Sequence, residues 1–287
     1  MMQFIAVACG VLAAVQSVQA DETTIGAAKD NTLYEDAKGR LSNGAGEHFF
    51  AGKTGAFNNF LLRRGLISFD IAGSIPEGST ITSVTLTLHL SAAAPGSGNQ
   101  PVSLHRLLAD WGEGDSDAAG SEGAGAPAAP GDATWLHTFF DTEVWARSGG
   151  DFDDIASAVT LVGTAMGEFP TWSTPQMASD VQDWLDDPTG NFGWLVLGNE
   201  DENQTARRFD THEHPDPDLR PLLHIEFETA EPCPWDLDGN NDVGVGDLLV
   251  LLGAWGANPG HPADFDGNGA VGVSDLLALL ANWGPCP

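Results

Sequence analysis

Positive charge is scarce in this chain of 287 residues. It has 11 Lys and Arg residues against 41 Asp and Glu residues, which gives a formal net charge of −30. A surface that binds nucleic acid or an anionic membrane needs clustered cations. The composition therefore argues against direct binding to DNA, RNA or anionic lipid. It also leaves many carboxylates available to hold divalent metal ions.

Long apolar runs are absent as well, because no stretch beyond the first twenty residues is long enough to span a bilayer. Residues 1–20 carry no charged side chain, and an apolar stretch runs from Phe4 to Val15. The segment closes with Val18 and Ala20, which fit a signal-peptidase cleavage pattern. We therefore predict that residues 1–20 are a secretory signal peptide and that the protein is extracellular or at the cell surface. A short membrane anchor or a buried strand is the alternative.

Cysteine is the third scarce residue. One of the 3 cysteines, Cys9, lies in the predicted signal peptide, so the mature chain would keep only Cys233 and Cys286. In an exported protein an even pair of cysteines is usually bridged. We predict a disulfide between these two residues, which bracket one compact C-terminal segment.

Turn-forming residues and short alternating segments dominate residues 21–229. The chain has 35 Gly and 17 Pro, and residues 84–90 alternate strictly between apolar and polar side chains, as in a half-buried strand. Further strands are predicted at residues 65–71, 102–107, 194–197 and 222–227. This pattern predicts a mainly β fold, organised as a jelly-roll-like antiparallel β-sandwich.

Two segments of this domain have a different pattern. Thr174 can cap a helix that ends before Pro188, and its apolar face would be formed by Met177, Val181, Trp184 and Leu185. Residues 112–132 consist largely of Gly, Ala, Ser and acidic residues, and they are interpreted as a long flexible loop.

Residues 230–287 contain an internal repeat of two acidic loops, which begin 28 residues apart at Asp236 and Asp264. Each loop places side-chain oxygens at positions 1, 3, 5 and 12, the spacing of an EF-hand calcium loop, in which position 7 offers a backbone carbonyl. The predicted side-chain ligands are Asp236, Asp238, Asn240, Asp247, Asp264, Asp266, Asn268 and Asp275. The position-7 carbonyls would come from Asp242 and Ala270.

The turn at position 6 of each loop needs a residue that tolerates a left-handed backbone. Gly269 meets this need in the second loop, and Asn241 is the next best residue in the first. An apolar helix that ends in Trp-Gly follows each loop. Two matched copies favour a calcium-binding module, with an all-α fold and two Ca²⁺ sites, over the alternative of two solvated Asp-Gly-Asn turns.

The repeat resembles the type I dockerin family, whose members attach secreted proteins to cohesin partners. The resemblance covers both loops and implies two Ca²⁺ ions and a cohesin-like protein partner. Asp at position 12 is the choice typical of dockerins. Positions 10 and 11, where cohesin specificity is determined, depart from the usual small polar pair, since they are Val245-Gly246 and Val273-Ser274.

Several patches in residues 21–228 follow one another in a characteristic order. They are residues 30–35, 64–71, 75–78, 81–86, 111–114, 191–194 and 208–213. This series resembles the disaggregatase-related DNRLRE-type domain, a β-sandwich similar to a family of carbohydrate-binding modules. Residues 30–35 keep the motif that names the family only in part. The resemblance implies association with a polysaccharide or a cell-surface glycan and defines no reaction.

Aromatic residues near the predicted loops are the first candidates for a glycan site. Four could stack on sugar rings: Trp111, Trp135, Trp145 and Trp172. The alternative for each is a place in the core, because a sandwich of this size needs large buried aromatics. Trp184 and Trp194 lie on the predicted helix and on a predicted strand, and we assign them to the core.

Charged residues supply three further candidate sites. A salt-bridge cluster at a strand end would combine Arg207, Arg208, Asp210 and Glu213. A metal site would combine His212, His214, Glu213 and Asp216. A carboxylate pair for hydrolysis of a glycosidic bond would combine Glu113 and Glu213.

Three functions are compatible with the sequence. The first is a secreted, non-catalytic binding protein tethered through its calcium module. The second is a glycoside hydrolase or lyase with the same tether, and the third is a structural component of a surface layer or matrix. The chain has no Gly-x-Ser-x-Gly motif, phosphate-binding loop or His-Glu-x-x-His motif, so the first function is favoured.

Overall fold

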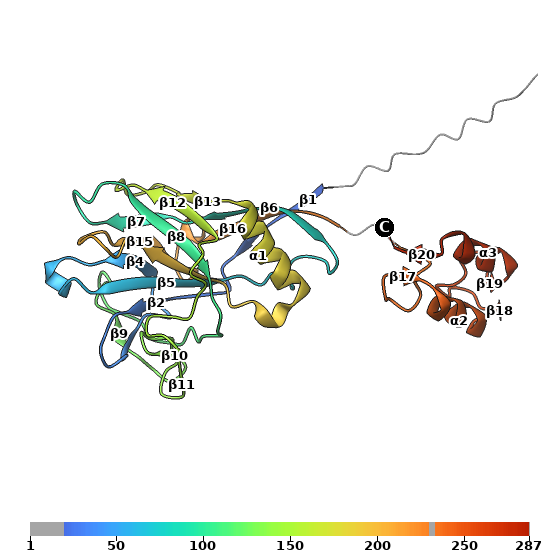
Figure 1. Cartoon of the computed structure of the whole chain (residues 1–287), viewed down its shortest axis with the longest axis horizontal. Helices are drawn as coiled ribbons and strands as arrows, with labels where there is room; N and C mark the ends of the chain where they lie inside the picture. The colour runs from blue at the N-terminus through green and yellow to red at the C-terminus, as the bar shows by residue number, and fades with distance from the viewer. Residues whose placement is uncertain (1–19, 230–232, 287) are drawn as a thin grey trace, which may run out of the picture. The chain divides into compact units, whose positions relative to one another are not determined.

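The computed structural model describes residues 20–229 and 233–286, which form two compact units (Figure 1). The β unit comprises Ala20–Glu228, and the C-terminal unit begins at Thr229. The predicted signal peptide lies outside the described residues, except for Ala20, which begins the first strand.

Two antiparallel sheets build the β unit. The first has the strand order β1 (Ala20–Gly26), β16 (Leu222–Glu228), β6 (Thr80–Thr87) and β13 (Thr171–Trp172). The second has the order β12 (Ala158–Val162), β8 (Gln100–Arg106), β14 (Trp194–Gly198), β5 (Leu62–Ser68), β4 (His48–Lys53), β15 (Arg207–Asp210) and β7 (Leu90–Ala93), and β2 (Lys29–Tyr34) also pairs with β5. Short pairs join β3 (Leu41–Ser42) to β9 (Ala126–Pro127), and β10 (His137–Phe139) to β11 (Glu143–Val144).

The main core lies between these two sheets. Val84 and Ile225 from the first sheet belong to the same buried cluster as Val102 and Val196 from the second. All of these side chains are at most 1% exposed, so the two sheets exclude water between them. The prediction of a mainly β, antiparallel fold is confirmed.

A second core lies under loops on the other face of the larger sheet. Its buried members are Leu33, Leu66, Leu107, Trp111, Ala133, Trp135, Trp145 and Leu195. Consecutive residues such as Leu66 and Ile67 therefore enter different cores, and both are buried. This explains why the central strands of the larger sheet are apolar on both faces.

The predicted strand at residues 84–90 is divided in the structure. β6 ends at Thr87 and β7 begins at Leu90, and the two strands belong to different sheets. Leu88 and Leu90 are fully buried in the same core as Val84. The alternation continues across the break because both sheets face one core, so the sequence pattern does not reveal where the chain changes sheet.

The predicted helix is confirmed as α1 (Pro175–Asp186). The hydroxyl oxygen of Thr174 accepts a hydrogen bond from the backbone N–H of Met177 at 3.1 Å, as an N-cap does. Every apolar residue predicted for its inner face is buried. Three short 3₁₀ turns complete the β unit: η1 (Ala56–Asn58), η2 (Pro188–Gly190) and η3 (Pro217–Leu219).

The predicted flexible loop at residues 112–132 is attached to the sheet at several points. The buried carboxylate of Glu122 accepts hydrogen bonds from the backbone of His48 (2.8 Å) and from the side chain of Asn43 (2.9 Å). The hydroxyl group of Tyr34 donates to the backbone carbonyl of Glu122 at 2.8 Å. The segment is a long loop that includes the short strand β9, and its buried contacts give it a structural role that its composition does not indicate.

The C-terminal unit contains two helices, α2 (Val245–Gly253) and α3 (Val273–Ala281). Four two-residue strands pair across the repeat: β17 (Asp242–Val243) with β20 (Gly284–Pro285), and β18 (Gly256–Ala257) with β19 (Ala270–Val271). Each pair therefore takes one strand from each copy. The buried core contains Val243 and Leu251 from the first copy and Val271 and Leu279 from the second.

Candidate functional site

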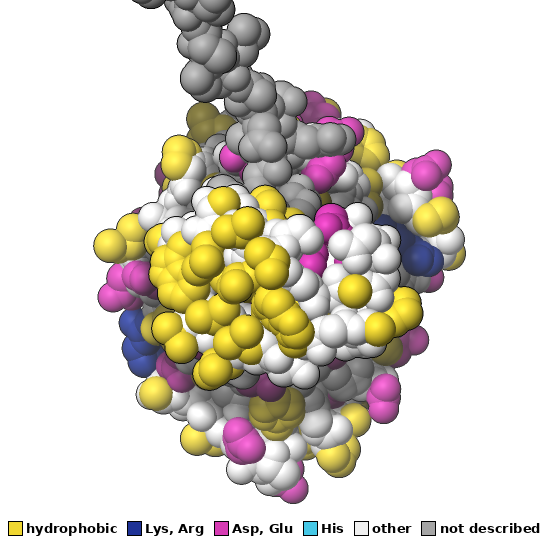
Figure 2. Space-filling view, turned by 90° about the vertical axis from the view of Figure 1, so that its right-hand side faces the viewer, with side chains coloured by type: hydrophobic (Ala, Val, Ile, Leu, Met, Phe, Trp, Pro, Cys, Tyr) yellow, Lys and Arg dark blue, Asp and Glu magenta, His cyan; other side chains and the backbone are white. Residues whose placement is uncertain are grey.

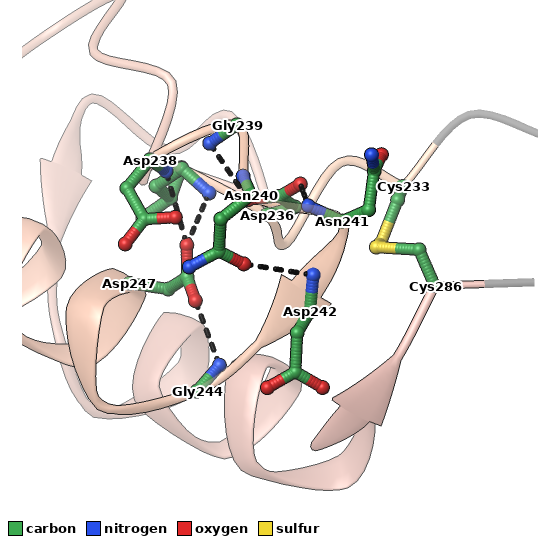
Figure 3. Close-up of a disulfide and its surroundings, with 11 residues drawn as sticks. Cys233, Asp236, Asp238, Gly239, Asn240, Asn241, Asp242, Gly244, Asp247 and Cys286 are labelled. Carbon is green, nitrogen blue, oxygen red and sulfur yellow. Dashed lines mark hydrogen bonds between the residues drawn. A yellow bond between two sulfur atoms is a disulfide. The ribbon is translucent and has the colours of Figure 1, made fainter. Parts of the chain in front are cut away.

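The first acidic loop folds around its own carboxylates (Figure 3). One oxygen of Asp236 accepts the backbone N–H of Gly239 and the other accepts that of Asn241, both at 2.8 Å. The buried carboxylate of Asp247 accepts the N–H groups of Leu237 (2.6 Å) and Gly244 (2.7 Å). These hydrogen bonds bring carboxylate oxygens of the three aspartates at positions 1, 3 and 12 within 4.8 Å of one another: Asp236, Asp238 and Asp247.

The second loop repeats this geometry. Asp264 accepts the N–H of Gly269 at 2.8 Å, and Asp275 accepts those of Phe265 and Gly272, both at 2.8 Å. The oxygens at positions 1, 3 and 12 again lie within 4.8 Å of one another: Asp264, Asp266 and Asp275. The two predicted clusters of carboxylates are therefore assembled.

The residues at positions 5, 6 and 7 also match between the loops. Asn240 accepts the backbone N–H of Asp242 at 2.9 Å, and Asn268 accepts that of Ala270 at 3.0 Å. In Figure 3 the carboxylate of Asp242 points away from the other acidic groups, which leaves its backbone as its contribution to the loop. At position 6 the backbone is left-handed in both copies, with φ 63° at Asn241 and 89° at Gly269.

The loops differ at position 11. Gly246 leaves room for Asp238, because a Cβ atom there would lie 1.8 Å from an oxygen of that carboxylate. Partial desolvation and the charge of Asp247 raise the pKa of Asp238. In the second loop a hydrogen bond from Ser274 helps to lower the pKa of Asp266. In the first loop, therefore, the carboxylate of Asp238 is closely surrounded and has no hydroxyl partner equivalent to that of Ser274.

The donor set of each loop fits a hard divalent cation. The clustered groups are carboxylates, and neither a histidine nor a cysteine belongs to either cluster. Oxygen donors of this kind suit Ca²⁺ or Mg²⁺. A cation would also offset the mutual repulsion of three close carboxylates.

A disulfide joins Cys233 to Cys286, as predicted (Figure 3). The backbone N–H of Cys286 donates a hydrogen bond to the carbonyl of Asn241 at 3.1 Å. The bridge therefore connects the start of the C-terminal unit to the residue after β20, which is hydrogen-bonded to the first loop.

An apolar face covers the two helices of the C-terminal unit (Figure 2). Val245 and Val273 are 63% and 64% exposed, and Trp255 and Trp283 are each 46% exposed. Two further exposed pairs lie 28 residues apart, and they are Leu249 with Leu277 and Leu252 with Leu280. These eight residues, the matched apolar face, have no charged neighbour on α2 or α3, because the aspartate of each helix is buried.

The four tryptophans expected to stack on sugar are buried in the β unit. Trp111, Trp145 and Trp172 are at most 5% exposed, and the indole N–H of each donates to a backbone carbonyl at 2.8–2.9 Å. Trp135 is 9% exposed and lies under the guanidinium group of Arg64. These tryptophans therefore have the alternative role, which is a place in the core. Their rings build the two cores and offer no open face to a sugar. Trp184 and Trp194 lie in the main core, as predicted.

The predicted cluster of Arg207, Arg208, Asp210 and Glu213 does not form. Arg207 is fully buried and donates to the carbonyl of Gly98 at 2.5 Å. Arg208 donates to Ser91, and Asp210 contacts the imidazole ring of His89 at 2.5 Å. Strand β15 directs the adjacent side chains of Arg207 and Arg208 to opposite faces of the sheet, and Glu213 lies beyond the end of the strand.

The predicted metal set of His212, His214, Glu213 and Asp216 is also divided. His214 lies with Glu47 and His48, whereas Asp216 caps the turn η3. His212 and Glu213 instead meet Asp30 and Glu113, and one donor atom from each of these four residues lies within 4.8 Å of the others. We call these four residues the His212 cluster.

The His212 cluster brings Glu113 and Glu213 together, with one carboxylate oxygen of each within 4.8 Å of the other. Burial raises the pKa of Asp30 to about 6 and that of Glu113 to about 7. Hydrogen bonds from its ring to Asp30 and Glu213 raise the pKa of His212 to about 10. Asp30 comes from β2, and no pattern in the sequence places it beside residues 212 and 213.

No protein-family model matches the chain, and no curated protein matches it either. Within the described residues no helix has the length and apolar character that a bilayer span requires.

Proposed function

We propose that this is a secreted, non-catalytic protein whose C-terminal unit is a calcium-dependent, dockerin-like docking module. The β unit is its cargo, with the jelly-roll-like organisation of a DNRLRE-type domain. A disulfide is typical of exported proteins, and it supports secretion. Two assembled carboxylate clusters support a two-ion calcium module.

The matched apolar face is the observation that carries this proposal. Water-exposed valine and leucine on two short helices, with an exposed tryptophan just after each, are unfavourable unless they bind a partner. Each helix begins at position 10 of its acidic loop and contains the aspartate at position 12, so the ion and the face depend on the same backbone. We infer that Ca²⁺ organises the face and that an apolar surface of a cohesin-like protein covers it.

The proposed role of the β unit is to contact a polysaccharide or cell-surface glycan. The DNRLRE-type resemblance supports this role, and the burial of Trp111, Trp135, Trp145 and Trp172 excludes their rings as the contact surface. A glycan array on the intact protein tests it, followed by a reducing-sugar release assay. Binding without release supports the binding role, release supports a hydrolase or lyase that uses Glu113 and Glu213, and neither result supports a structural component.

Docking is tested with immobilised cohesin domains and the full-length, calcium-loaded protein. We expect binding in Ca²⁺, no binding in EGTA, and no binding by the double variant Leu249→Ser, Leu277→Ser. Leu108→Ser is the matched control, because Leu108 is exposed on the β unit. Cohesin binding that survives the double substitution contradicts docking through this face. Calcium-dependent self-association without cohesin binding identifies a second copy of the chain as the partner instead.

A further inference from the structure

The His212 cluster is assembled from three distant parts of the β unit. Asp30 belongs to β2, Glu113 follows Trp111 in a loop, and His212 and Glu213 follow β15. The Nδ1 atom of His212 lies 3.1 Å from an oxygen of Asp30 and 3.6 Å from an oxygen of Glu113. Its Nε2 atom lies 2.9 Å from an oxygen of Glu213.

The hydrogen bonds of this cluster leave oxygen atoms without partners. Asp30 is fully buried, and its Oδ2 atom accepts the backbone N–H of His212 at 2.9 Å. Its Oδ1 atom is inaccessible to solvent and has no hydrogen-bond partner, and the same is true of Oε2 of Glu213. A buried carboxylate oxygen without a donor is unfavourable and calls for a partner that the protein itself does not supply.

The charges of the cluster indicate what that partner is. Three carboxylates surround one imidazole, and in the described part of the chain no Lys or Arg forms an ion pair with any of them. Lys29, the neighbour of Asp30 in sequence, donates to Asp110 and to the carbonyl of Trp111. A bound divalent cation would supply the missing partner.

We propose that Asp30, Glu113 and His212 form a binding site for a divalent transition-metal ion, outside the two acidic loops. The ligands would be the two carboxylates and the Nδ1 atom of His212. An imidazole nitrogen together with carboxylates suits Zn²⁺, Mn²⁺, Fe²⁺ or Co²⁺, whereas Ca²⁺ prefers oxygen donors alone. Two carboxylates and a neutral imidazole also balance the charge of a divalent ion.

Glu213 would hold the imidazole in place. With Nδ1 bound to the ion, the N–H at Nε2 donates to Glu213, the arrangement that orients most metal-binding histidines. Binding of the ion displaces the proton from Nδ1 to solvent. The side chains of Glu113 and His212 are 25% and 28% exposed, so the site is open on one side to water and to the entering ion.

Co²⁺ tests this site, because its visible absorption reports the coordination geometry. The full-length protein is first saturated with Ca²⁺ to fill the acidic loops. We expect one Co²⁺ per chain, displaced by Zn²⁺, and a higher unfolding temperature of the β unit. Glu213→Gln should weaken binding about 10–100-fold, as loss of an orienting carboxylate does. His212→Gln and Glu113→Gln should weaken it further.

The control is His224→Gln, which removes a histidine from an exposed group with Glu22 and Glu226. It should bind Co²⁺ as the native protein does. Circular dichroism and thermal unfolding of each variant show whether its β unit is folded. No Co²⁺ absorption by the native protein, or an unchanged spectrum and affinity in folded Glu113→Gln, overturns the proposal.

Discussion

The backbone N–H of Cys286 donates a hydrogen bond to the carbonyl of Asn241, at the sixth position of the first acidic loop. Asn258 makes the equivalent bond to Gly269 in the second loop, also at 3.1 Å. The two bonds are related by the repeat, but only Cys286 is covalently fixed, through its bridge to Cys233. The disulfide therefore supports one loop directly and the other only through the shared core.

Loss of the disulfide should weaken the first calcium site more than the second. The double variant Cys233→Ser, Cys286→Ser removes a bridge that is typically worth about 2–5 kcal/mol in a small secreted domain. We expect Asn241, beside the broken link, to need more Ca²⁺ for its amide NMR signal to shift. The amide of Gly269 is the internal control, and equal losses at both loops would contradict direct support.

Removal of calcium should unfold the C-terminal unit alone. The carboxylates of each loop lie within 4.8 Å of one another, and their repulsion opposes folding when no cation is bound. Scanning calorimetry in Ca²⁺ should show a transition that EGTA removes, while the transition of the β unit remains. A C-terminal unit that keeps its helical circular dichroism and its melting temperature in EGTA would show that the calcium assignment is wrong.

Replacement of Trp111 should destabilise the β unit, because its ring is 1% exposed in the second core. For Trp111→Ala we expect a loss of about 3–5 kcal/mol in the free energy of unfolding, measured with urea. Trp255→Ala is the contrasting variant, since Trp255 lies on the matched apolar face. It should change stability by only about 0.5 kcal/mol and should impair docking. If Trp111→Ala keeps full stability but loses glycan binding, its structural role is wrong.

The stability of the β unit should fall as the pH rises. Asp30 and Glu113 have their pKa raised, from 3.8 to about 6 and from 4.5 to about 7, so the folded state holds their protons more tightly. The cost of their ionisation is absent below about pH 4 and is complete only after the pH has risen through about 7. The pKa of His212 is raised from 6.5 to about 10, so its stabilisation is full below pH 6.5 and lost as the pH rises through 10.

Urea unfolding at pH 5, 7 and 9 measures this trend, in buffer with Ca²⁺ and without transition metals. Glu113→Gln should flatten the decline between pH 5 and 7. His212→Gln should flatten it between pH 7 and 9. A stability of the native β unit that rises between pH 5 and 9 would contradict the assigned direction of these shifts.

Local patterns in the sequence predict those elements whose signals are themselves local. Helix α1 follows from the cap Thr174, from Pro175 and from one apolar stripe, and its bounds match. The acidic loops follow from fixed spacing within twelve residues, because each loop bonds to its own backbone. The disulfide follows from there being only two cysteines outside the predicted signal peptide.

Contacts between distant strands are not predictable in this way. His212 is adjacent to Asp30 only because the loop after β15 passes over the start of β2, and the register of the strands determines that contact. The burial of Trp111 and Trp145 likewise depends on a second core beneath long loops. The sequence of these loops shows only that they are rich in Gly and Ala. A single sequence contains no periodic signal for either arrangement.

The crossed strand pairs of the C-terminal unit have a consequence for the proposed binding of calcium. Each pair, β17 with β20 and β18 with β19, joins one loop to the end of the opposite helix. An ion bound in one loop therefore orders a strand that pairs with a strand of the other copy. The two ions should bind cooperatively, with a Hill coefficient greater than one, so the protein would attach and release over a narrow range of calcium concentration.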